Sequence, residues 1–283
     1  MFFVVIPILV SCLSVMTVRG RGESRPAGLP VARPRLVAAG GTYDGSRGRP
    51  SDAYVIQERL IAAAHGMGSA GSAGSAEHAH TAAALALASV VAARPQRAGT
   101  REKDLGECAQ AAHRAARAAA LLHATDPATS GSTPSAGPRP AASGSVPGGT
   151  GPVSSLDLVV LDQDQQPRLR YAHVGDGAIW HCAKGAEPRP LTTAHAFDGG
   201  TVTGGSGLPS ALTPETGTLP LRSGDRVAIV TEGVTRALGA ARLKALLASG
   251  SSPAACLDRL YDEMSALEPE GDATVIIADV VTA

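Results

Sequence analysis

The segment GDRVAIVTEGVT, residues 224–235, decides the fold together with GDATVIIADVVT, residues 271–282. Each contains a short apolar run rich in β-branched residues, at 226–231 and 274–281. Such runs are typical of strands that are buried on both faces. The two segments therefore predict two central strands of a covered sheet.

Two helices are predicted between these strands. Residues 242–249 place Leu243, Leu246 and Leu247 on one side. Residues 253–267 repeat apolar residues at helical spacing. Serines precede this helix and Pro253 lies in its first turn, which is a typical helix start.

The remaining elements follow the same reading. Residues 53–57 and 60–64 predict a β-hairpin, and the alanine-rich stretches 76–92 and 102–123 predict helices. Three further strands are predicted at 156–161, 169–174 and 178–182. Hairpin, helix pair, strands, helix pair and final strand indicate an α+β fold with helices segregated onto sheets.

The chain of 283 residues is long enough for one main domain with tails. Residues 1–18 are an apolar segment, and residues 19–40 read as a linker rich in Gly, Pro and Arg. The main domain is expected over 41–283. It is interrupted at about 125–152 by a Pro, Ser and Gly-rich stretch with too little apolar bulk to order itself, which predicts a disordered insertion.

The apolar segment 1–18 has three readings. Arg19 and Arg21 follow it, which favours a membrane tether with the protein in the cytoplasm. The run from Leu9 to Cys12 also resembles a lipoprotein cleavage box, which would make the chain an exported or membrane-bound lipoprotein. The third reading is a start codon assigned too far upstream.

Composition excludes several function classes. Basic and acidic residues balance at 25 each, so no overall field attracts nucleic acid, and a membrane role would depend on the N-terminal segment alone. The four cysteines are widely separated, which indicates reduced thiols and neither a zinc site nor a disulfide framework. HExxH, GxSxG and Walker motifs are absent from the sequence.

Six segments, in order, resemble the motifs of the metal-dependent type 2C (PPM-type) Ser/Thr protein phosphatases, in their bacterial form. They are RGRPSDA (47–53), IAAAHGMG (61–68), YAHVGDGAIW (171–180), LTTAH (191–195), GDRVAIVTEGVT (224–235) and GDATVI (271–276). Each motif alone is weak, whereas six in family order and spacing form a strong signal.

The resemblance implies a four-layer α-β-β-α sandwich, in which two packed antiparallel sheets are flanked by helices. It also implies Mn²⁺ or Mg²⁺ ions that activate a water to attack a phosphoserine or phosphothreonine. Carried over by position, Asp52, Gly66, Asp176, Glu232 and Asp272 would hold metal. Asp52, Asp272 and Arg47 would serve catalysis, with Arg47 gripping phosphate.

The sequence departs from the family motifs in its metal ligands. His65 stands at the position of the bridging aspartate, and an imidazole can ligate one cation but cannot bridge two. Glu232 replaces another aspartate and is one methylene longer. Pro50 and Ser51 replace Asn-Glu and remove a further acidic group. One weakly bound cation is therefore more defensible than two.

Two functions follow, both expected of a monomer that meets a phosphorylated protein or a signalling partner. One is a PPM-type phosphatase with weakened catalysis. The other is a catalytically dead pseudophosphatase that acts as a phosphoprotein-binding or signalling module, and fold alone does not separate the two. The bland alternative for Asp52, Asp176 and Asp272, each taken singly, is a cap or turn aspartate.

Overall fold

The computed structural model describes residues 33–46, 51–67, 75–97, 99–124, 153–162, 167–194, 197–198, 201–202 and 213–282. The chain divides after Arg33, and the elements below belong to the unit Pro34–Ala283. The apolar segment 1–18 and the predicted insertion at 125–152 lie outside the described residues. Among the helices that the structure describes, none is both long and apolar enough to cross a membrane.

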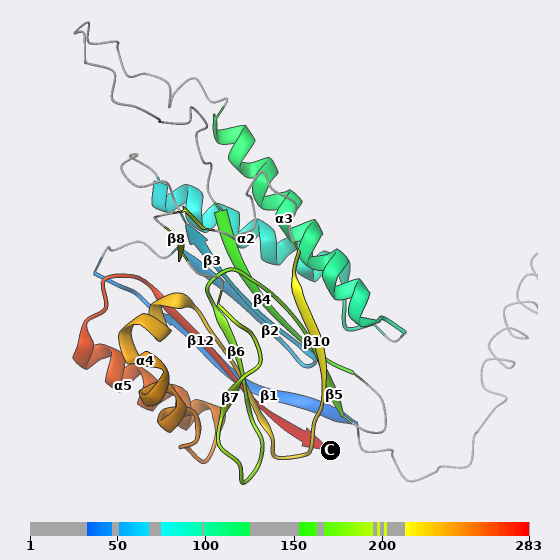
Figure 1. Ribbon diagram of the computed structural model, residues 1–283, viewed down its shortest axis with the longest axis vertical. Coiled ribbons are helices and arrows are strands. Elements are labelled where there is room, and N and C mark those ends of the chain that lie inside the picture. The colour runs from blue at the N-terminus through cyan, green and yellow to red at the C-terminus, as the bar shows by residue number, and fades with distance from the viewer. Residues whose placement is uncertain are drawn as a thin grey trace, which may run out of the picture. The chain divides into compact units, whose positions relative to one another are not determined.

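The described strands form two five-stranded antiparallel sheets and a two-stranded ribbon (Figure 1). Sheet A has the order β1 (Pro34–Tyr43), β12 (Ala273–Thr282), β11 (Arg226–Val230), β6 (Ala178–Cys182), β7 (Arg189–Pro190). Sheet B has the order β10 (Glu215–Pro220), β5 (Arg168–Val174), β4 (Val153–Leu161), β3 (Leu60–Met67), β2 (Asp52–Gln57). The ribbon pairs β8 (Phe197–Asp198) with β9 (Thr201–Val202).

Within the described ranges, a pair of helices packs on the outer face of each sheet. Helices α2 (Ser75–Ala93) and α3 (Glu102–Ala124) pack on sheet B, and α4 (Glu232–Leu247) and α5 (Pro253–Leu267) pack on sheet A. The predicted start of α5 is confirmed, since the Ser252 hydroxyl accepts a hydrogen bond of 3.2 Å from the Ala255 amide and Pro253 opens the first turn.

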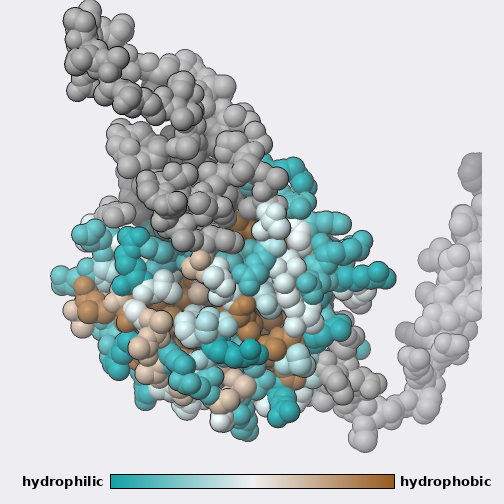
Figure 2. Space-filling view, viewed as in Figure 1, coloured by the Kyte–Doolittle hydropathy of each residue, from teal (hydrophilic) through white to brown (hydrophobic). Residues whose placement is uncertain are grey.

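Three apolar layers hold the elements together. One lies between α2, α3 and sheet B, and a second between α4, α5 and sheet A. The third fills the space between the sheets and includes Ile61, Val159, Ile229 and Ile276. In the view of Figure 2, hydrophilic residues cover much of the described surface and apolar ones form smaller groups between them. The predicted four-layer sandwich is confirmed.

The predicted linker is wrong over its last residues. Strand β1 pairs with β12 along its whole length, from Pro34 opposite Thr282 to Tyr43 opposite Ala273. The glycines in this stretch serve close packing: a Cβ at Gly41 would lie 2.2 Å from the hydroxyl of Tyr261 on α5. The glycines that made this stretch look like a linker instead allow α5 to approach β1 closely.

Helix α4 begins at Glu232, ten residues before the predicted helix at 242–249. Gly239, with φ of 70°, kinks the helix, so its first part points differently from its second. Val234, in the first part of α4, is buried in the apolar layer between sheet A and the helices α4 and α5. Glycines at 233 and 239 interrupt the apolar periodicity and hide this part from sequence reasoning.

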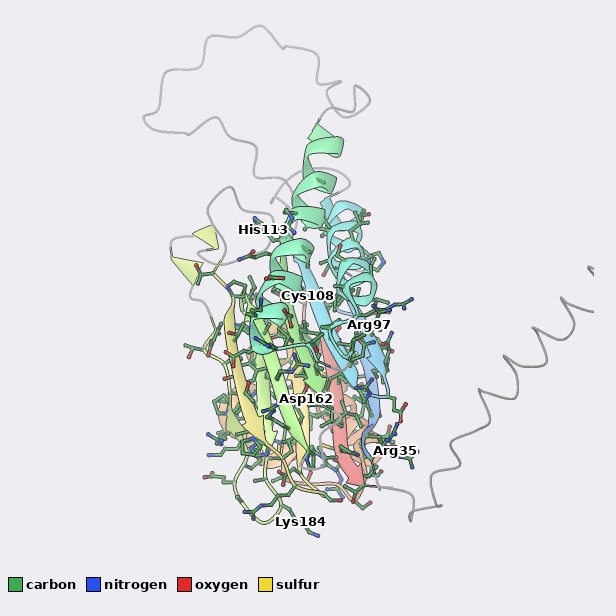
Figure 3. All side chains as sticks on the ribbon, turned by 90° about the vertical axis from the view of Figure 1, so that its right-hand side faces the viewer. Arg35, Arg97, Cys108, His113, Asp162 and Lys184 are labelled. Atoms are coloured by element: carbon green, nitrogen blue, oxygen red, sulfur yellow. The ribbon has the colours of Figure 1, made fainter. Side chains whose placement is uncertain are left out.

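The cysteines that the structure describes are free and buried. Burial raises the pKa of Cys108 to about 11 and that of Cys182 to about 12. Figure 3 labels Cys108 on α3, whose buried side packs on sheet B. Thiols with such pKa values are protonated at neutral pH and act as small apolar groups, as predicted.

Arg226 fastens the loop between α4 and α5 to sheet A. Its guanidinium donates to both Asp279 oxygens, over 2.7 and 3.1 Å, and to the carbonyls of Ser249 and Gly250, over 3.0 and 3.3 Å. The planar guanidinium presents its donors in a fixed fork that matches both oxygens of one carboxylate, which an ammonium group lacks.

We expect Arg226→Ala to lower the free energy of unfolding by about 2–3 kcal/mol, because it leaves a largely buried carboxylate and two carbonyls without their donor. Urea unfolding followed by circular dichroism measures this loss. Arg242→Ala removes an exposed ion pair to Glu263 between the same two helices and is the matched control, with an expected midpoint near that of the wild type. Equal midpoints for the two variants would contradict the assigned role of Arg226.

His173, on β5, is a fully buried histidine that pairs with a carboxylate. Its Nδ1 lies 2.7 Å from the Asp157 carboxylate and its Nε2 lies 3.2 Å from the Thr193 carbonyl oxygen. Both neighbours accept hydrogen bonds, so both ring nitrogens must carry a proton. Burial lowers the pKa of His173, but the charge and hydrogen bond of Asp157 outweigh it, and the pKa lies above the ordinary 6.5.

A histidine with a raised folded-state pKa contributes stability that is full below its unfolded pKa and is lost as pH rises through the folded value. The wild type should therefore lose unfolding free energy between about pH 6.5 and higher pH more steeply than His173→Gln. Urea unfolding of both proteins across this range is the measurement. Parallel pH profiles would show that His173 is not protonated in the folded protein.

Candidate functional site

The predicted site residues on β2, β3 and β12 meet at one end of the sandwich. Asp52 begins β2 and pairs in register with His65, which lies near the end of β3 in the same sheet. Asp272 immediately precedes β12 of sheet A, and Thr231 immediately follows β11. The two sheets thus bring four polar side chains together from segments that are far apart in the sequence.

Asp52 is buried, and both of its carboxylate oxygens have protein partners. His65 Nδ1 contacts Oδ1, and the Thr231 hydroxyl donates to Oδ2 over 2.9 Å. The same hydroxyl accepts the Thr274 amide over 2.9 Å. Asp52 is therefore held by a donor from its own sheet and a donor from the other.

Asp272 is also buried and doubly engaged. Its Oδ1 accepts the Gly45 amide over 3.1 Å, and its Oδ2 accepts the amide and the hydroxyl of Ser51, the latter over 2.9 Å. Gly45 follows β1 and Ser51 precedes β2, so Asp272 joins both ends of the segment between these strands. Arg47, the predicted phosphate-gripping residue, lies in that segment but outside the described residues.

Asp176 differs from the other two aspartates. It follows Gly175, whose φ of 104° makes the turn between β5 and β6, and it is buried. Its Oδ1 has no hydrogen-bond partner in the described part of the chain. Burial raises the pKa of Asp176, although the charges of His65 and His173 act against this rise. Asp176 is thus a predicted ligand with a buried carboxylate oxygen that no hydrogen bond from the described residues engages.

Asp157 occupies the space beside this turn. A Cβ at Gly177 would lie 2.0 Å from Asp157 Oδ2. Gly177 stands where the family motif has serine, so the missing side chain makes room for the buried Asp157 and its partner His173. Gly177 lies within one of the six sequence motifs, whereas Asp157 lies outside them and was not predicted as a site residue.

Glu232 and Gly66 are placed by contacts within the chain. Glu232 opens α4 and forms an ion pair with Arg236, one helical turn later. The Gly66 amide donates to the Ser51 carbonyl over 3.0 Å, and a Cβ at Gly66 would lie 2.0 Å from the Ala79 carbonyl oxygen on α2. Glycine at position 66 is therefore required by the packing of α2, whatever its carbonyl does.

His65 carries a positive charge more readily than an ordinary histidine. Burial lowers the pKa of its imidazole, but the hydrogen bond to Asp52 and the charges of Asp52, Asp176 and Glu232 outweigh it. The net pKa therefore lies above 6.5. An imidazole paired with Asp52 stands at the position where the family motif places a carboxylate.

The residues present do not fit a pair of divalent cations. Within the described ranges, no group of three or more His, Cys, Asp or Glu side chains is arranged to hold a metal ion. Cation binding by Asp52 or Asp272 would have to compete with the hydrogen bonds that engage both oxygens of each. The structure places Asp52, His65 and Asp272 at one end of the sandwich, and the hydroxyl donors Ser51 and Thr231, which the sequence motifs did not indicate, engage the carboxylates.

No protein-family model matches the sequence, and no curated protein is significantly similar to it. Solved structures do match the fold. The Mycobacterium tuberculosis serine/threonine phosphatase PstP/Ppp aligns with a TM-score of 0.67 at 18% identity, covering 88% of this chain and 100% of that chain. The catalytic domain of PstP with two manganese ions aligns with a TM-score of 0.67 at 19% identity, covering 88% of this chain and 99% of that chain.

A third match is PppA, a regulatory component of the type VI secretion system (T6SS) in Pseudomonas aeruginosa. It has a TM-score of 0.65 at 15% identity and covers 87% of this chain and 97% of its own. The sheet order, the two helix layers and these matches agree: the chain has the fold of the bacterial PPM-type serine/threonine phosphatases.

Proposed function

We propose that this chain is a pseudophosphatase, a phosphatase-fold protein that binds a phosphoprotein or a signalling partner without two-metal hydrolysis. The observation that carries the proposal is the pairing of His65 with Asp52 at the position of the bridging carboxylate. An imidazole, which has no negative charge to offer, replaces an anionic carboxylate at the place where two dications would have to be joined.

The chemistry of the replacement supports this proposal. Two-metal hydrolysis needs an anionic bridge that draws two cations together and offsets their repulsion. His65 supplies no negative charge, and its Nδ1 is already engaged by Asp52. The manganese pair named for PstP therefore has no matching bridge in this chain.

The environment of Glu232 points the same way. Its carboxylate pairs with Arg236, so a cation would have to compete with a guanidinium for the same oxygen. The pair is partly exposed and contributes little to stability, but Arg236 offsets the negative charge that Glu232 would otherwise offer a cation.

A signalling role draws on the fold and on its named examples. The matched structures are described as serine/threonine phosphatases, and PppA as a regulatory component of a secretion system. A protein that keeps this fold but not the metal bridge is suited to recognising the same class of phosphorylated partners. Arg47, by the family resemblance, is the residue for phosphate recognition.

Weak hydrolysis with a single cation is the second candidate, favoured by Asp176. Its buried Oδ1 has no partner among the described residues, which leaves one anionic oxygen for a cation. One carboxylate oxygen is a poor cage for a hard cation, which prefers six or more oxygen ligands.

We expect the full-length wild type to hydrolyse an aryl phosphate in manganese no more than about twofold faster than Asp272→Ala. His65→Asp restores an acidic bridge and should gain manganese-dependent turnover. His65→Asn, whose new side chain has the size of aspartate but no charge, should not gain it. The rate of release of the coloured phenolate gives the turnover of all four proteins. Robust wild-type turnover that disappears in Asp272→Ala would overturn the pseudophosphatase proposal.

Calorimetric titration with manganese chloride tests metal binding apart from turnover. The wild type should show no stoichiometric binding, because protein donors engage Asp52 and Asp272. His65→Asp should bind at least one ion per chain. Two ions bound by the wild type would contradict the misfit between these residues and a metal pair.

A further inference from the structure

Asp52 and Asp272 each connect sheet B to sheet A. Thr231, which follows β11 of sheet A, donates to Asp52 on β2 of sheet B. Ser51, which precedes β2, donates to Asp272, which precedes β12 of sheet A. Both links lie at the same end of the sandwich.

We infer that these two carboxylates act as metal-independent clamps that hold the sheets together at this end. The inference rests on the proposed function in taking the carboxylates to be free of cations. It assigns Asp52 and Asp272 a role that is structural and specific to this chain, with Ser51, His65 and Thr231 as their partners.

The polar clamp continues the apolar layer between the sheets. Side chains two residues apart on a strand share a face. Ile61 and Ala63 of β3 and Ile229 of β11 belong to the apolar layer between the sheets, and His65 and Thr231 are the next residues on those faces. Where apolar packing stops, hydrogen bonds take over the contact between the sheets.

The first clamp is a continuous chain of hydrogen bonds. It runs from His65 through Asp52 to the Thr231 hydroxyl, which in turn accepts the Thr274 amide. The Thr274 hydroxyl lies 2.8 Å from that of Thr42 on β1, so the chain extends across β3, β2, β11, β12 and β1. Thr231 uses its donor and an acceptor at once, which makes it the central member.

The second clamp holds Gly45 and Ser51, which follow β1 and precede β2. Asp272 accepts the amides of both residues, and the Ser46 amide donates to the Pro269 carbonyl over 3.3 Å. Backbone donors cannot be removed by side-chain substitution, so this clamp is the harder of the two to weaken.

A buried carboxylate is costly unless charged or polar donors satisfy it. In a metal-bound site of this fold a cation would do so. Here the chain supplies partners to both oxygens of each carboxylate: His65 and Thr231 to Asp52, and Gly45 and Ser51 to Asp272. The stability of this end of the domain should therefore be independent of divalent cations.

Thr231→Val tests the first clamp, with Thr231→Ser as the matched control that keeps the hydroxyl. In the full-length protein with EDTA, we expect Val to lower Tm by about 4–10 °C and Ser by less than about 2 °C. Amide exchange at Thr274 should become faster in Thr231→Val, because that amide loses its acceptor. Manganese chloride in place of EDTA should leave the Tm of the wild type unchanged.

Equal Tm values for Thr231→Val and Thr231→Ser, with unchanged exchange at Thr274, would overturn the clamp. A Tm of the wild type that rises by several degrees with manganese would overturn its metal independence. The two proposals fail separately: manganese-dependent wild-type turnover rejects the pseudophosphatase, whereas the EDTA comparison of the Thr231 variants judges the clamp alone.

Discussion

The carboxylate of Asp52, held between His65 of its own sheet and Thr231 of the other, is the constraint on which this end of the molecule depends. Everything at the site follows from how that buried negative charge is satisfied. A cation would satisfy it and leave a site for chemistry. A histidine and a hydroxyl satisfy it and leave a fixed contact between two sheets. The residue at position 65 on β3 thus decides whether an aspartate at position 52 is available to a cation or forms a structural contact.

The fold tolerates this exchange because three apolar layers stabilise the sandwich independently of the site. The interior charges away from the site are likewise paired, as with Arg226 and Asp279. Low identity to the matched phosphatases, under 25% throughout those compared, is compatible with the same sheet order, since apolar patterning specifies the strands and tolerates many substitutions. Fold and chemistry are therefore separable in this chain.

Sequence reasoning succeeded where the pattern was periodic. The strand at 226–231 and the capped helix at 253–267 were predicted nearly to their ends, because β-branched runs and a serine followed by proline have few alternative meanings. It failed for β1 and the start of α4, where glycines serve close packing or a kink rather than a loop. Glycine composition alone does not distinguish these uses.

The hydrogen bonds between the candidate site residues could not be predicted from the sequence. Family motifs placed Asp52, His65 and Asp272 together, and the structure brings them to one end. Thr231 donates to Asp52, which is 179 positions away in the sequence. Ser51 donates to Asp272, which is 221 positions away. No local pattern reports such contacts. The sequence carried one signal of the altered site: Ser51 and His65 stand at two positions where the family motifs have acidic residues.

The pairing of β1 with β12 has a practical consequence. Pro34 lies opposite Thr282, whereas Tyr43 lies opposite Ala273, the neighbour of Asp272. The first and last residues of the domain's strands therefore emerge side by side, a strand length away from the aspartates. Attachment of the protein through the C-terminal end of β12 would therefore leave the end of the sandwich that holds Asp52 and Asp272 at the far side from the support.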